Sequence, residues 1–267
     1  MTHIRRKPIL IIASLALLFL LACNATFTVG FPTPTIVPSP TVSPIPASSP
    51  TSQPLKISTL IYEEVGQDPA FTIKAEFPAV LETNDPRVSS FNTKAHDLVQ
   101  TAVEEFKRGV SELPDDPNFT SSYLEVKYTL LSQTNNVASI KFVFSFYSAG
   151  AAHPGDYSMT LNYDIGQGRE LALEDLFLSN SNFLEVIANY CITELSKQPF
   201  FDGPFTDGAN PTVENYRNWN ITPEGLMITF DTYQVAPGAA GPQVVVVPYG
   251  QISAVIDPQG ALAGIIR

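Results

Sequence analysis

A long central stretch in which apolar and polar residues alternate constrains the fold most. Between Leu124 and Ile165, three segments place an apolar side chain at every second position. Because successive side chains of a strand point to opposite faces, this period of two predicts three long strands, each with one buried face. The pair Asn135-Asn136 separates the first two segments and is typical of a hairpin turn. The alternating apolar positions are Leu124, Val126, Tyr128 and Leu130, then Ile140, Phe142, Phe144 and Phe146, then Tyr157, Met159, Leu161, Tyr163 and Ile165.

Two segments with helical spacing lie on either side of these strands. In residues 88–110 an apolar residue recurs every three or four positions, which predicts a helix with one buried stripe. A second helix is predicted from the apolar side shared by Leu184, Ile187, Cys191 and Leu195.

Shorter strands are predicted at residues 71–77, 226–231 and 244–247. The unbroken apolar run of the last of these favours a central place in a sheet. Strands that come in runs, with helices apart from them, indicate an α+β fold. We therefore expect antiparallel sheets with a few packed helices, arranged as two small subdomains.

The first 54 residues predict an export signal followed by a tether. Basic residues precede an apolar run over 8–22, which is the pattern of a signal peptide. The run ends in Leu-Leu-Ala before Cys23, and this resembles the lipobox of bacterial lipoproteins, in which the cysteine is acylated after cleavage. Residues 23–54 are rich in Pro, Ser and Thr, a composition that favours a disordered linker. We expect residues 1–22 to be the signal peptide and the chain to be anchored in the cell membrane by lipid, facing outside.

Two domains are expected after the tether, at residues 55–135 and 136–267, and no disulfide framework supports them. With Cys23 acylated, Cys191 has no cysteine to pair with, so a hydrophobic core must hold the fold. The net charge of the whole chain is −11. Such acidity argues against nucleic acid as a partner and is compatible with a basic protein or peptidoglycan.

Histidine is the usual proton carrier in catalysis, and two histidines follow the signal. His96 lies beside the apolar stripe of the first helix, and we interpret it as a surface residue. His153 lies in a loop of small residues, 147–155, between two predicted strands. Small residues permit a ligand to approach closely, but they also suit a tight structural crossing, so both interpretations of this loop stay open.

Sequence motifs of common catalytic sites are missing from the chain. It contains no Gly-x-Ser-x-Gly, His-Glu-x-x-His, phosphate-binding or dinucleotide-binding motif. Residues 229–233 are similar to the start of the metal-binding motif of polysaccharide deacetylases, but the second aspartate, the glycine and a following His-x-x-x-His are missing. Cys191 on an apolar stripe is expected to be inert packing. We predict no catalytic residue, no metal site and no cofactor.

The central and C-terminal stretches resemble the extracytoplasmic region of the anti-sigma-V factor (RsiV-like) family, whose best-known member senses lysozyme. The stretches that carry this resemblance are 147–154, 161–164, 168–171, 173–177, 225–237 and 247–249. The part before them, with Phe77-Pro78 and the first helix, resembles a companion domain that also precedes the catalytic domain of a peptidoglycan deacetylase. The resemblance implies an α+β module outside the membrane that recognises a protein or a wall ligand. It does not imply control of a sigma factor, because only residues 1–7 precede the apolar run.

Our first hypothesis is a non-catalytic, lipid-anchored binding protein or sensor for a basic, lysozyme-like protein or for a cell-wall component. The second is a wall hydrolase that uses His153 as base or ligand, supported by Asp156 or Asp175, and the third is a passive structural envelope protein. Exposed aromatics beside glycine and proline make good contact surfaces. The expected ligand-binding residues are Tyr147, Gly150, His153, Pro154, Tyr157, Tyr233 and Pro237.

Overall fold

The computed structural model describes residues 55–265, except 115, 117–120 and 202. Cys23, the signal peptide and the linker expected before residue 55 lie outside the described residues. In residues 55–265 no described helix is long and apolar enough to cross a membrane.

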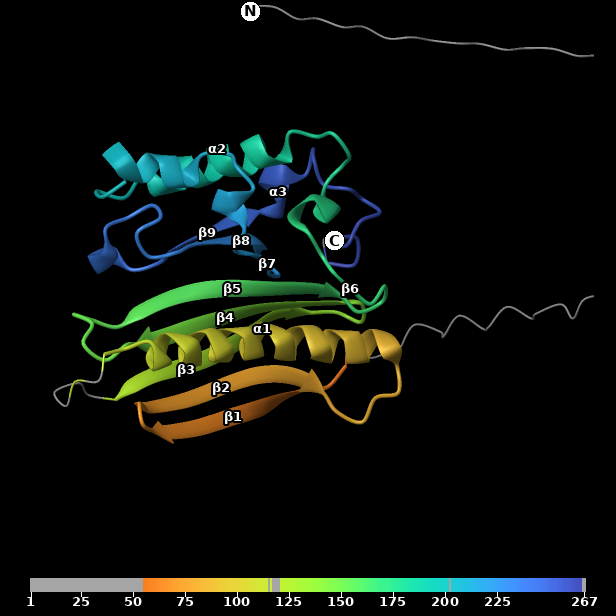
Figure 1. The fold of residues 1–267 in the computed structure, drawn as a ribbon. Helices are drawn as coiled ribbons and strands as arrows, with labels where there is room; N and C mark the ends of the chain where they lie inside the picture. The colour runs from red at the N-terminus through yellow and green to blue at the C-terminus, as the bar shows by residue number, and fades with distance from the viewer. Residues whose placement is uncertain (1–54, 115, 117–120, 202, 266–267) are drawn as a thin grey trace, which may run out of the picture. The chain divides into compact units, whose positions relative to one another are not determined.

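A curled six-stranded sheet forms the centre of the described region (Figure 1). Its strands follow one another in chain order, and each neighbouring pair is antiparallel except β2 and β3. That one pair is parallel because the helix α1 crosses over between the two strands. The strands are β1 (Ile57–Gln67), β2 (Ala70–Val80), β3 (Ser122–Gln133), β4 (Val137–Tyr147), β5 (Gly155–Asp164) and β6 (Arg169–Glu170).

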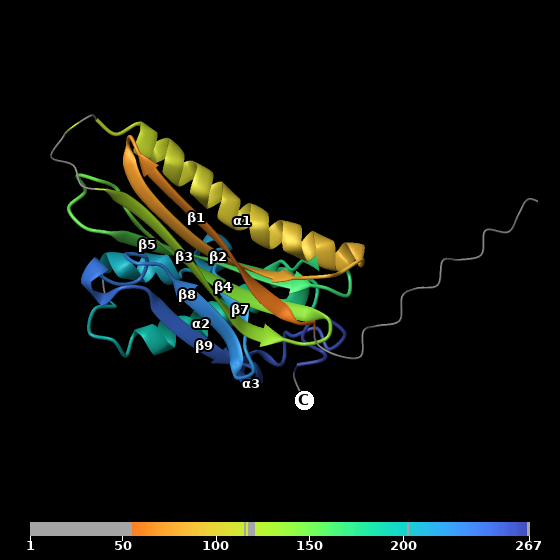
Figure 2. The ribbon, with the colours of Figure 1, turned by 90° about the horizontal axis from the view of Figure 1, so that it is seen from below.

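Helix α1 (Pro86–Ser111) lies along one face of this sheet (Figure 2). Its start is set locally, because the Asp85 side chain accepts a hydrogen bond from the Arg87 backbone N–H and proline occupies the first turn. The predicted apolar stripe is the face that packs on the sheet. Phe91, in the second turn of the helix, is fully buried and contacts the Tyr163 ring edge-to-face at 5.5 Å between centroids.

A second layer covers the other face of the β4–β5 part of the sheet. A three-stranded sheet in the order β7-β8-β9 packs there, and α2 (Phe183–Leu195) lies on its far side (Figure 1). The remaining elements are β7 (Trp219–Ile221), β8 (Gly225–Phe230), β9 (Gln243–Pro248), α3 (Tyr249–Ile252) and the short 3-10 helices η1 (Leu173–Leu176), η2 (Gly203–Ala209), η3 (Glu214–Tyr216) and η4 (Gly238–Ala240). The expected α+β class is thereby confirmed.

Two hydrophobic cores result, one between α1 and the large sheet and one around α2 and the small sheet. The expected domain limit between residues 135 and 136 falls in the turn that joins β3 to β4, and these two strands pair along their length. Most residues before about 170 belong to the first core and those after it to the second, as Ile165 and Leu171 do, but Val137 on β4 also belongs to the second. The large sheet therefore draws on both expected domains.

One predicted strand position is wrong, because β9 is an edge strand of the small sheet and not a central strand. Val245 and Val247 are buried, whereas Val244 and Val246 are exposed to solvent. A run of valines suits any pleated strand, so apolar continuity alone did not distinguish burial on two faces from burial on one.

Buried polar side chains join the two layers. Ser139 on β4 donates its hydroxyl hydrogen to Asn162 Oδ1 at 2.6 Å, and its oxygen accepts from the Ile221 backbone N–H at 2.9 Å and from Asn220 Nδ2 at 3.0 Å. Asn162 Nδ2 in turn donates to the Trp219 carbonyl at 2.7 Å. The network fixes β7 against β4 and β5, since each member has a partner on the opposite sheet.

Cys191 is a free, fully buried cysteine in the core around α2, as its place on the apolar stripe predicted. Burial raises the pKa of its thiol to about 12, so the reactive thiolate is scarce in the folded chain. We expect iodoacetamide at about pH 8 to leave the Cys191 peptide unmodified in the native protein and to alkylate it in concentrated urea. Mass spectrometry of the Cys191 peptide measures this, and rapid alkylation without urea would contradict the buried position.

Candidate functional site

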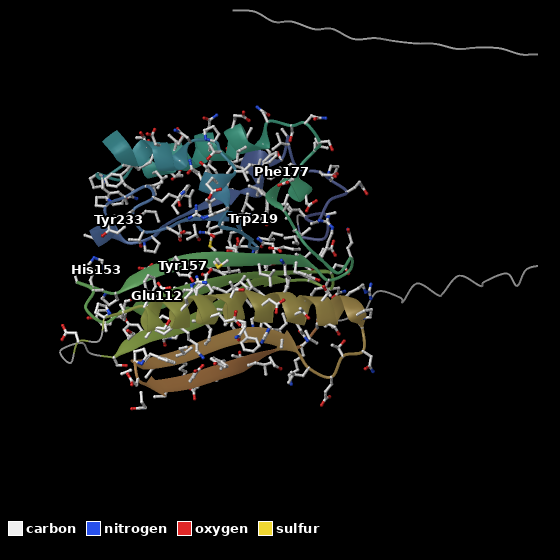
Figure 3. The ribbon with its side chains drawn as sticks, in the orientation of Figure 1. Glu112, His153, Tyr157, Phe177, Trp219 and Tyr233 are labelled. Carbon is white, nitrogen blue, oxygen red and sulfur yellow. The ribbon has the colours of Figure 1, made fainter. Side chains whose placement is uncertain are left out.

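The two loops that sequence reasoning selected lie at the same end of the described region (Figure 3). One is the β4–β5 connection with the first two residues of β5, residues 148–156, and it carries His153. The other is the connection after β8, residues 231–240, which carries Tyr233. We call these two segments together the loop tip. The Ser158 backbone N–H, next to the first segment, donates to Asp231 Oδ1 at 3.0 Å, and Thr232 Oγ1 lies 3.4 Å from Asp156 Oδ2.

Asp231 is the residue that holds the second segment in place. Besides the bond from Ser158, its Oδ2 accepts from Arg217 Nη2 and from Asn218 Nδ2, both at 3.0 Å. Its backbone carbonyl accepts from the Gln234 N–H at 2.9 Å, which closes the turn that contains Tyr233. One residue, through its carboxylate and its backbone carbonyl, therefore connects the large sheet, the small layer and this turn.

Tyr233 is both exposed and fixed. Its backbone has a φ of 72°, a left-handed conformation that non-glycine residues adopt rarely and that concentrates at functional positions. The ring lies directly against the backbone of Gly238. A Cβ atom added to Gly238 would be only 2.2 Å from Tyr233 Cζ, so only glycine fits at position 238. Even so, 63% of the residue remains exposed. The result is a phenol ring that is held against the loop and open to solvent.

His153 is exposed, and its Nδ1 donates to the Pro154 carbonyl at 2.8 Å. The carboxylates that the hydrolase hypothesis requires do not meet it. Asp156 lies within reach of Thr232, and Asp175 pairs with Arg169 at 2.7 Å beyond the opposite end of β5. Ten residues of strand separate the two ends by about 30 Å.

The other expected ligand-binding residues divide into two groups. Gly150 has a φ of 87° in the exposed β4–β5 loop, and Pro154 and Pro237 are exposed on the loop tip. Tyr157, by contrast, stacks on Phe144 at 4.7 Å on the side of the sheet that faces α1, and burial raises the pKa of its hydroxyl to about 12.

Tyr147, at the end of β4, is partly buried and stacks with Tyr123 at 6.1 Å. The structure thus brings His153, Pro154, Tyr233 and Pro237 together at one end, while the rings of Tyr147 and Tyr157 pack on neighbouring rings of the large sheet.

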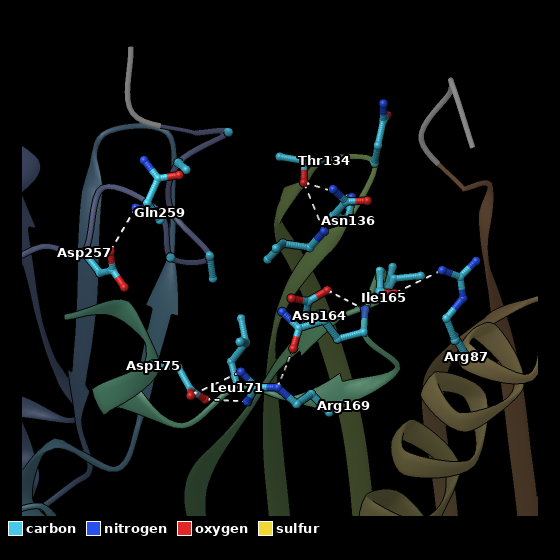
Figure 4. A pocket seen from close by; sticks show the side chains of 18 of the residues that line it. Arg87, Thr134, Asn136, Asp164, Ile165, Arg169, Leu171, Asp175, Asp257 and Gln259 are labelled. Carbon is cyan, nitrogen blue, oxygen red and sulfur yellow. Dashed lines mark hydrogen bonds and ion pairs between the residues drawn. The ribbon is translucent and has the colours of Figure 1, made fainter. Parts of the chain in front are cut away.

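Sequence reasoning missed a cleft of about 750 Å³ at the opposite end (Figure 4). One wall consists of the β3–β4 turn, the β5–β6 turn and the start of α1, and the other consists of η1 and residues 257–264. The sequence predicts the first of these turns from Asn135-Asn136. Nothing in the local pattern indicated that they would face a segment some ninety residues further along the chain.

Two ion pairs lie in the wall of this cleft. Arg87 contacts Asp85 at 2.6 Å and donates to the Gly166 carbonyl at 3.0 Å, while Arg169 forms a two-bond pair with Asp175. Each guanidinium holds the pKa of its carboxyl partner below the ordinary value, so these carboxylates stay ionised into the acid range.

Comparison with known proteins extends the structural description. The model of the family described as "Protein of unknown function (DUF3298)" matches residues 174–250. The chain is 25% identical over 166 residues to the peptidoglycan-N-acetylmuramic acid deacetylase PdaC of Bacillus subtilis, and this match covers 61% of the chain but only 35% of the deacetylase. It is also 23% identical over 189 residues to the immunogenic protein MPT64 of Mycobacterium tuberculosis, covering 71% of the chain and 79% of that protein.

Solved structures share the fold at low sequence identity. A DUF3298 family member from Bacteroides fragilis superposes with a TM-score of 0.59 at 15% identity, covering 79% of this chain and 96% of that one. A second, from Pseudomonas aeruginosa, gives 0.55 at 16% identity and covers 77% of this chain. Residues 174–250 are therefore similar to a family of unknown function, and the fold of solved DUF3298 proteins extends over more than three quarters of the chain.

Proposed function

We propose that this chain is an extracytoplasmic, lipid-anchored binding domain without a catalytic role, and that the loop tip is its contact surface for a basic secreted protein of lysozyme type. The observation that carries the proposal is the fixed, exposed ring of Tyr233. Peptidoglycan is the alternative ligand that the experiment below separates from a basic protein.

An aromatic ring that is already held in place loses little conformational entropy when a partner covers it. Tyrosine is also among the residues that contribute most to binding when they lie at the centre of a contact surface. Around Tyr233, the exposed Pro237 and His153 widen the surface that a partner would cover. These features favour a role in contact for the loop tip.

Charge favours a basic partner. The formal net charge of −11 would steer a cationic protein towards the domain, and the resemblance to the anti-sigma-V factor family points to lysozyme as the type of partner. His153 has its Nδ1 on a backbone carbonyl and not on a carboxylate. For this reason we assign contact, not proton transfer, to this histidine.

Replacement of Tyr233 by alanine is expected to weaken the binding of hen lysozyme by roughly 30-fold, which corresponds to about 2 kcal/mol for a central aromatic residue. Calorimetric titration of the chain without its first 23 residues measures this. Tyr233→Phe keeps the ring and should bind nearly as the parent does.

Leu81→Ala is a matched control, because Leu81 is an exposed apolar residue at the end of β2, outside the loop tip. It should leave the affinity unchanged. Binding to insoluble peptidoglycan, with none to lysozyme, would contradict the basic-protein partner, and an unchanged affinity of Tyr233→Ala would contradict the loop tip as its site.

A further inference from the structure

We propose that the cleft between the β3–β4 and β5–β6 turns and residues 257–264 is a second binding site, for a hydrophilic ligand that carries ammonium groups and has the size of a short amino-sugar oligomer. This site is separate from the loop tip and does not depend on the function proposed for it.

The size of the cleft fits such a ligand. Its volume of about 750 Å³ lies within the range of small-molecule sites. It is open on one side and is built by segments that are themselves held together, since Asn136 O accepts from the Ile165 N–H at 2.6 Å and Gly168 packs against Arg87. The wall that these turns and α1 form is therefore in place before a ligand arrives.

The charge of the lining favours a cation. Five carboxylates and two guanidinium groups line the cleft, and each guanidinium is paired with one of the carboxylates. The other three carboxylates, those of Asp164, Glu174 and Asp257, form no ion pair with any residue of the described chain. A concave surface that carries this surplus of negative charge concentrates cations.

Asp164 is a buried carboxylate in the lining of the cleft. It is only 7% exposed, yet the single hydrogen bond that its carboxyl group accepts from the described residues is from the Gln167 backbone N–H, at 2.9 Å. A buried carboxylate is costly unless charge or hydrogen bonds compensate it. The charge of Arg169 compensates the Asp164 carboxylate in part, and an ammonium group in the cleft would add to this compensation.

Amide side chains supply the remaining polar contacts. Asn135, Asn136, Gln167 and Gln259 all line the cleft, and each can donate and accept hydrogen bonds. Hydroxyl groups of a sugar need both roles, whereas an apolar ligand would make no hydrogen bond with these amides. The combination of amides and unpaired carboxylates is what points to an amino sugar.

Calorimetric titration with a β-1,4-linked glucosamine trimer, at a pH where its amines are protonated, tests the site. Its N-acetylated counterpart keeps the hydroxyl groups but lacks the charges. We expect saturable binding of the glucosamine trimer and binding of the acetylated trimer that is weaker by about tenfold or more. Equal binding of the two trimers, or no saturable binding of the glucosamine trimer, overturns the proposal.

Variants locate the binding within the protein. Asp164→Asn and Asp257→Asn should each weaken binding of the glucosamine trimer by about tenfold, and the second keeps the test valid if the first fails to fold. Asp97→Asn is the matched control, because Asp97 is an exposed carboxylate on α1 outside this cleft. Tyr233→Ala should bind the trimer as the parent does, which separates this site from the loop tip. Unchanged affinity in both cleft variants overturns the proposal.

Discussion

Replacement of Ser139 by alanine is expected to lower the free energy of unfolding by about 2–4 kcal/mol, although only one oxygen atom is removed. Ser139 is fully buried between the two sheets, and its hydroxyl serves three partners. Without it, the Ile221 N–H and Asn162 Oδ1 each lose a hydrogen bond at a place that water does not reach. Each such buried group without a partner costs about 1–3 kcal/mol.

Urea unfolding followed by circular dichroism measures this loss. Ser145→Ala is the matched control, since Ser145 lies on the same strand and the same face of β4 but outside the network and closer to solvent. Its substitution should change stability by less than about 0.5 kcal/mol. Equal effects of the two substitutions would show that the network does not hold the layers together.

Phe91→Ala should be the most destabilising single change in the core beneath α1, with an expected loss of about 3–5 kcal/mol. Phe91 is fully buried in the second turn of α1, between the helix and the large sheet, so loss of its ring leaves a cavity in the core. The edge-to-face contact with Tyr163 would be lost as well.

Phe106→Ala provides the comparison within the same helix and the same apolar stripe. Phe106 is partly exposed and contacts Phe71 at the margin of the core. Less apolar area returns to water there, so the loss should be about 1–2 kcal/mol in the same urea experiment. A Phe106→Ala loss as large as that of Phe91→Ala would contradict the placement of the core.

The sequence predicted those parts of the fold that depend on local periodicity. The central strands and α1 follow directly from spacings of two and of three to four residues. Strand β1 was missed because it is an edge strand with exposed apolar residues on both faces, such as Leu60 and Ile61, so its sequence does not alternate. The parallel pairing of β2 with β3 and the edge position of β9 depend on contacts between distant segments.

The two candidate sites differ in the same way: one has a local signal in the sequence, and the other depends on contacts between distant segments. The loop tip was predicted because its composition is unusual within each loop, and the structure then places the His153 and Tyr233 loops together. The cleft has no such signal. Asp164, Asp175 and Asp257 each look like ordinary surface carboxylates in their own segments, and only the packing of the C-terminal turn opposite β5 makes them neighbours.

The bond between Asp231 and β5 also affects how copies of this domain meet. Strand β5 is the last long strand of its sheet, and such an edge invites pairing with a strand of another molecule. At one end of β5 the two-residue β6 occupies the edge, and at the other the Asp231 carboxylate takes the Ser158 N–H that an incoming strand would need. The stretch of edge between them admits only a short pairing, so joining of the large sheets of crowded copies through β5 is disfavoured.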